Sequence, residues 1–78
     1  MILYADTKRQ ANRIARAIAT MTGYQPTVFG QDGRYRVQEN NFGTDWQEAL
    51  ESLLAQDIKA DDCTLERVEE EMKRLEIR

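Results

Sequence analysis

The sequence predicts a single α+β domain over residues 1–78, with a short, mainly antiparallel three-stranded sheet packed with helices in the order β-α-β-β-α-α. Three observations predict it. The chain is long enough for one small core only. Two short segments around a glycine have the composition of a β-hairpin, and three longer segments repeat apolar residues at helical spacing. If the first helix crosses over the sheet, the strand order is 1-3-2, with antiparallel neighbours.

The first strand and the first helix are predicted by local signals. Residues 2–5, ILYA, form a run of apolar and aromatic residues that is long enough for a brief strand and too short for a helix. A helix is expected over residues 8–22, because Thr7 and Gln10 have the spacing of a capping box and Gly23 can end the helix in the left-handed conformation. Its expected buried face consists of Ala11, Ile14, Ala15, Ile18 and Thr22.

Residues 28–37, VFGQDGRYRV, are typical of a β-hairpin, and two registers are compatible with them. A two-residue turn at Asp32-Gly33 would leave Phe29 pointing outward among the arginines. A three-residue loop at 31–33 would pair Phe29 with Tyr35 and bury both rings. Leaving a Phe in water forfeits about 1.5–3 kcal/mol of burial, so we expect the three-residue loop.

Two further helices are predicted in the second half of the chain. Thr44 and Gln47 repeat the capping-box spacing ahead of an apolar stripe formed by Trp46, Ala49, Leu50, Leu53 and Leu54, which should supply the largest share of the core. Asp61 or Asp62 can cap a third helix that runs to about Glu76, with a narrow stripe at Leu65, Val68, Met72 and Leu75. That stripe permits pairing between two copies, but we expect it to pack onto its own domain, which favours a monomer.

Charge is distributed unevenly along the chain. Residues 1–44 hold six basic and three acidic side chains, whereas residues 45–78 hold five basic and eleven acidic ones, for a net charge of −3. A domain that binds nucleic acid is usually basic overall, so direct nucleic-acid binding is the less favoured class. A local basic face in the first half is still compatible with the composition.

The residue types argue against catalysis and against a metal or other cofactor. The chain has no histidine, which removes the usual general base near neutral pH and the usual zinc ligand. Cys63 is the only cysteine; with no second cysteine to pair with, it fits a reducing, cytoplasmic location and is interpreted as a small packing residue. No stretch reaches the ~20 apolar residues that a membrane span requires, and no signal peptide is expected.

Two candidate binding surfaces emerge. The first is basic and consists of Arg9, Arg13, Arg34, Arg36 and Gln38, from the polar face of the first helix and the outward side of the second hairpin strand. Arginine suits such a surface because its paired donors clamp carboxylates or phosphates. The alternative is an acidic surface on the third helix that would imitate a phosphate backbone, formed by Glu66, Glu69 and Glu70. Both sets are also compatible with ordinary solvated faces.

The segment LYADTKRQAN at residues 3–12 opens a short chain without histidine, and it resembles the starts of small proteins encoded by phages and mobile elements. Anti-CRISPR inhibitors are the best-known functional group among these proteins. The resemblance implies a non-catalytic inhibitor in the host bacterial cytoplasm that binds a CRISPR effector complex, and so a protein or ribonucleoprotein partner, and blocks target-DNA binding or nuclease recruitment. It implies no particular site residues. The alternative is a small nucleic-acid-binding module that uses the arginine-rich first helix and the hairpin face.

Overall fold

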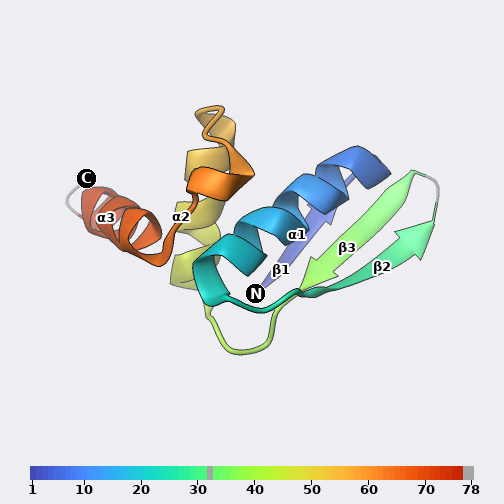
Figure 1. Cartoon of the computed structure of the whole chain (residues 1–78), viewed down its shortest axis with the longest axis horizontal. Coiled ribbons are helices and arrows are strands. Elements are labelled where there is room, and N and C mark those ends of the chain that lie inside the picture. Colours follow the sequence, from blue (N-terminus) through green and yellow to red (C-terminus); the bar gives the residue numbers. More distant parts are fainter. Residues whose placement is uncertain (32, 77–78) are drawn as a thin grey trace.

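The structure is a computed structural model that describes residues 1–31 and 33–76. The elements follow the predicted order, with one short 3-10 turn added before the last helix (Figure 1). They are β1 (Ile2–Ala5), α1 (Lys8–Thr22), β2 (Thr27–Gln31), β3 (Arg34–Gln38), α2 (Thr44–Ala55), η1 (Ala60–Asp62) and α3 (Leu65–Glu76). The predicted α+β fold class is therefore confirmed.

The three strands form one open sheet in the predicted order β1-β3-β2, and both neighbouring pairs are antiparallel. On one side of β3, Tyr4 of β1 pairs with Arg36. On the other side, Phe29 of β2 pairs with the same Arg36. Side chains that are opposite one another in a sheet point to the same face, so these three residues form a row across it.

The hairpin register corrects the sequence prediction. Gln31 pairs with Arg34 and Gly30 pairs with Tyr35, which leaves two residues between the paired ends and places Phe29 outward. The expected pairing of Phe29 with Tyr35 is therefore wrong, and Asp32, which both candidate turns contain, lies outside the described residues. The outward position costs Phe29 less burial than expected, because the side chain is only 43% exposed and the guanidinium of Arg36 lies over its ring.

The ends of α1 are formed by the residues that predict them. The hydroxyl of Thr7 accepts a 3.1 Å hydrogen bond from the backbone N–H of Gln10. The Gln10 side chain accepts in turn from the N–H of Asp6, one residue earlier than in a standard capping box. Gly23 ends the helix with a φ of 83°, and its N–H donates to the carbonyl of Ala19.

The predicted caps of the two later helices are wrong by a few residues. α2 begins at Thr44 with Gly43 in the cap position and no side-chain cap bond. The side-chain oxygen of Gln47 is used elsewhere, as the acceptor of a 3.3 Å bond from the N–H of Ile2, which ties α2 to β1. For α3, the N–H of Arg67 donates to the hydroxyl of Thr64, so Thr64 and not the expected aspartates occupies the cap.

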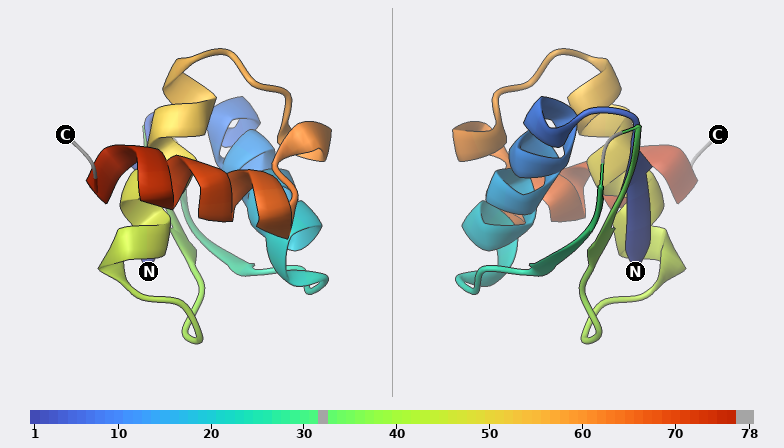
Figure 2. Two further views of the ribbon diagram at one scale, coloured as in Figure 1. Left: turned by 90° about the vertical axis from the view of Figure 1, so that its left-hand side faces the viewer. Right: turned by 90° about the vertical axis from the view of Figure 1, so that its right-hand side faces the viewer.

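The core lies between the inner face of the sheet and the helices, and its largest fully buried side chains include Leu3, Ile18, Leu50, Val37 and Val68. α1 covers the inner face and also packs against η1 and α3, while α3 packs across α2 (Figure 2). Trp46 is only half-buried, packed edge-on against Phe42 with ring centroids 4.9 Å apart. Cys63 is fully buried, and that burial raises the pKa of its thiol.

Candidate functional site

The face of the sheet opposite α1 is open, and it is the candidate site. We define the open sheet face by the outward strand positions, which are Ile2, Tyr4, Thr27, Phe29, Gln31, Arg34, Arg36 and Gln38. α3 does not cover this face, because it packs on α2 and α1. Tyr4, Arg34 and Arg36 are consequently exposed.

The centre of the open sheet face is the row Tyr4, Arg36 and Phe29. Tyr4 is 71% exposed, and Phe29, a residue type that is usually buried, is 43% exposed. The Arg36 Cζ atom lies 4.8 Å from the centroid of the Phe29 ring, in a cation–π contact. A shallow hollow of ≈ 220 Å³ surrounds the row, lined by Tyr4, Phe29, Gly30, Arg34, Tyr35 and Arg36.

The open sheet face is basic. Its described strand positions carry two arginines, Arg34 and Arg36, and no acidic residue. On the β1 side, Glu51 of α2 shares a separate hollow with Tyr4. A planar anion or an anionic backbone would therefore find two fork-shaped donors beside two exposed rings.

The basic residues predicted on the first helix do not share this face, because α1 packs on the inner side of the sheet. Arg9 is exposed on α1 and lines a hollow with Arg16. Arg13 has a structural role: its Nη2 donates 3.1 Å hydrogen bonds to the carbonyl oxygens of Leu54, within the last turn of α2, and Ile58, beyond it. The five predicted residues thus divide between two sides of the molecule.

Other polar residues near these surfaces already have partners. Gln38, at the end of the open sheet face, is partly buried and its amide donates a 2.9 Å bond to Asn40. Arg16 on α1 forms an ion pair with Asp61 of η1. Hydrogen bonding within that pair raises the pKa of Arg16 and lowers the pKa of Asp61.

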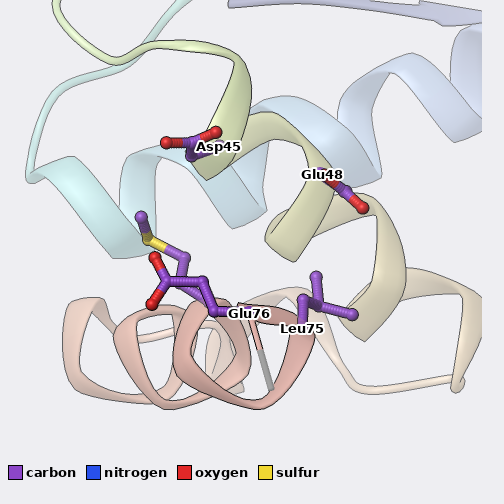
Figure 3. Close-up of a pocket in the computed structure, with 5 residues that line it drawn as sticks. Asp45, Glu48, Leu75 and Glu76 are labelled. Carbon is purple, nitrogen blue, oxygen red and sulfur yellow. The ribbon is translucent and has the colours of Figure 1, made fainter. Parts of the chain in front are cut away.

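Acidic residues gather on α2 and α3, toward the end of the molecule opposite the hairpin loop (Figure 1). Figure 3 shows one hollow of ≈ 110 Å³ between these helices, lined by Asp45, Glu48, Met72, Leu75 and Glu76. The predicted acidic residues Glu66, Glu69 and Glu70 are all exposed on α3. An acidic cluster of this kind repels anions, so it is not a site for a phosphate. It leaves the molecule with an acidic region at α2 and α3 and a basic open sheet face.

Sequence reasoning missed the two aromatic rings of the open sheet face. The sequence predicts Tyr4 as part of an apolar strand and Phe29 as part of the core. The alternation of side chains along ILYA carried a signal, because Leu3 and Ala5 can be buried only if Tyr4 points the other way. The position of Phe29 depended on the hairpin register and could not be found from β2 alone.

Among the described residues, no cluster of three or more His, Cys, Asp or Glu side chains is arranged to hold a metal ion. Within the same part of the chain, none of the helices combines the length and apolar character needed to cross a membrane. A scan against protein-family models and searches of curated proteins and of solved structures found no match to the chain.

Proposed function

We propose that the chain is a non-catalytic binding module that docks on a bacterial protein or ribonucleoprotein complex through its open sheet face. The observation that supports this is the exposed row of Tyr4, Arg36 and Phe29. Tyrosine and arginine are enriched among the residues that dominate binding energy, and leaving a Phe ring half-exposed forfeits burial that a partner would restore. The absence of histidine from the sequence favours binding over catalysis.

The resemblance of residues 3–12 to phage-encoded proteins supplies the finer proposal. The partner is then a CRISPR effector complex in the host bacterial cytoplasm. A small domain seated on such a complex would inhibit it by occupying the path of target DNA or the docking surface of a recruited nuclease. A monomer suffices for either effect.

A binding assay on purified CRISPR effector complexes, together with capture from a bacterial lysate, tests the proposal. The doubly substituted variant Tyr4→Ala with Phe29→Ala, and separately Arg36→Glu, should weaken binding at least about tenfold, as expected for hot-spot residues. Matched controls on α3 are Leu65→Ala, an apolar side chain that is 40% exposed, and Arg67→Glu. Circular dichroism should report the same fold for every variant.

The controls decide between the two surfaces. If the Leu65 and Arg67 variants bind normally while the variants of the open sheet face do not, the proposal holds. If charge reversal at Glu66, Glu69 and Glu70 abolishes binding and the open sheet face is insensitive, the acidic surface of α3 is the docking site and the proposal fails.

A further inference from the structure

We propose that the open sheet face binds single-stranded nucleic acid, with bases stacked on Tyr4 and Phe29 and the backbone neutralised by Arg34 and Arg36. This inference rests on the proposed function, since it names the part of a ribonucleoprotein partner that the face contacts. The observation that supports it is that Tyr4, Arg36 and Phe29 lie side by side on three neighbouring strands, an arrangement that no single strand could supply.

The spacing of the rings suits a splayed single strand. Tyr4 and Phe29 lie on strands that flank β3, so their backbones are about 10 Å apart, two interstrand spacings. Arg36 stands between them with its guanidinium over the Phe29 ring. Unpaired bases stack on aromatic rings and on arginine planes alike, and this stacking tolerates any sequence because every base has a π-face. The row therefore offers a continuous surface for adjacent or nearly adjacent bases.

The charge distribution orients a nucleic acid on this face. The molecule is elongated, with extents of 38 × 22 × 21 Å, and α3 lies at the far end of the long axis from the hairpin loop (Figure 1). Carboxylates on α3 are thus separated from the loop end by more than the Debye length of about 8 Å at physiological salt. Arg34 lies at the hairpin end of the face, so the carboxylates of α3 do little to weaken its attraction for a phosphate.

The open sheet face is small, and its size matches a strand of a few nucleotides. Three strands about 4.8 Å apart, of four residues in β1 and five in β2 and β3 at about 3.4 Å each, give a flat projection of at most roughly 14 × 17 Å. A stable protein–protein interface takes about 800 Å² of accessible surface from each partner, so a protein docked here would also contact the surfaces beside the sheet. A strand of a few nucleotides needs only a groove with stacking rings and cations, which is what the face provides.

The test uses fluorescein-labelled oligouridylate and oligothymidylate of about eight nucleotides, within the usual site size of small single-strand-binding folds, with anisotropy as the readout. Tyr4→Ala and Phe29→Ala should each weaken binding about tenfold, whereas Tyr4→Phe should retain it because the ring remains. With two phosphate contacts on a single strand, affinity should fall roughly sevenfold between about 50 and 200 mM salt. Arg34→Glu combined with Arg36→Glu should remove that dependence.

Controls and a mapping experiment separate the outcomes. Arg67→Glu and Leu65→Ala should bind both oligonucleotides as the wild type does, and amide chemical shifts should change in β1, β2 and β3 but not in α3. Binding that is indifferent to the Tyr4 and Phe29 substitutions overturns the inference. If neither oligonucleotide binds, yet those substitutions abolish capture of a nuclease-treated complex, the face is a protein-docking surface: the inference fails while the proposed function stands.

Discussion

Ser52 donates a 2.6 Å hydrogen bond from its Oγ to the buried carboxylate of Glu71, and this bond joins α2 to α3. The same carboxylate accepts a 2.7 Å bond from the amide of Gln56 and two bonds from the guanidinium of Arg74. A buried carboxylate is tolerated only when its oxygens are fully bonded. Glu71 is therefore a structural residue of the helix pair and differs from the exposed glutamates on either side of it.

Stability should decrease in acid because of Glu71. Hydrogen bonds from Arg74 and Ser52 lower the pKa of this carboxyl from 4.5 to about 2. Because the pKa is lower in the folded protein than in the unfolded chain, ionised Glu71 stabilises the fold fully above about pH 4.5, and this stabilisation is lost as the pH falls toward about 2. Urea unfolding followed by Trp46 fluorescence across this range measures the effect.

The control for this prediction is Glu71→Gln, which keeps the shape and removes the charge. At neutral pH the variant should be about 1.5–3 kcal/mol less stable, since hydrogen bonds to charged groups are worth that much. Its stability should then change less between pH 4.5 and about 2 than that of the wild type. Equal acid sensitivity in both proteins would show that other carboxylates cause the loss.

Arg13 should matter for stability, whereas Arg9 should not. The guanidinium of Arg13 bonds the carbonyl oxygen of Leu54 in the last turn of α2 and that of Ile58 just beyond the helix, and so ties α1 to the end of α2. Arg13→Ala should cost about 1–2 kcal/mol for these two bonds, and Arg9→Ala should stay within about 0.5 kcal/mol. Thermal unfolding of the two variants measures the difference. Equal effects of the two substitutions would contradict a structural role for Arg13.

The centre of the core should be more sensitive to truncation than Trp46. Leu50 is fully buried, so Leu50→Ala should cost about 3–5 kcal/mol through lost contacts and a cavity. Trp46 lies at the border of the core against Phe42, and Trp46→Ala should cost about 1–2 kcal/mol, because much of its surface is already in water. Urea unfolding followed by far-UV circular dichroism compares the two; a larger loss at Trp46 would refute this order.

The elements and their order could be predicted because their signals are local. Thr7, Gln10 and Gly23 mark the ends of α1 within a few residues of the chain, and apolar spacing identifies the leucines of α2. The polar outward side of β3 was also predicted, since Tyr35 and Val37 alternate with Arg34 and Arg36.

The candidate site could be predicted only in part, because its decisive features depend on contacts between elements. Arg34 and Arg36 were identified, but the row they form with Tyr4 and Phe29 follows from the pairing of three strands. In the sequence, Arg13 has the position of a solvated binding residue. Its hydrogen bond to α2 becomes apparent only in the fold. Glu71 lies three residues after Val68 and four before Leu75, so helical spacing places it on the apolar stripe, but the Ser52 and Gln56 side chains that bind its carboxylate come from α2 and are not apparent from α3 alone.

In the observed hairpin register, the stability of the fold should depend strongly on Gly30. This residue has a φ of 129°, and a Cβ atom placed there would lie 2.3 Å from the carbonyl oxygen of Arg34 and 2.9 Å from the Cα of Tyr35. Both are backbone atoms of the paired strand, so they cannot give way without opening the hairpin. Gly30→Ala should therefore cost at least about 3 kcal/mol, combining backbone strain with the clash.

Gly33 supplies the matched control, since it also has a positive φ, 86°, but a Cβ atom there meets nothing within 4 Å. Gly33→Ala should cost about 1–2 kcal/mol for the left-handed conformation alone, and Gly33→Asn less, because Asn tolerates that region. In the three-residue register Gly30 would lie opposite Arg34 on the outward face, where Ala is harmless. Urea unfolding that finds Gly30→Ala no costlier than Gly33→Ala, with no cross-strand NOE between Phe29 and Arg36, would reject the paired row on which the open sheet face depends.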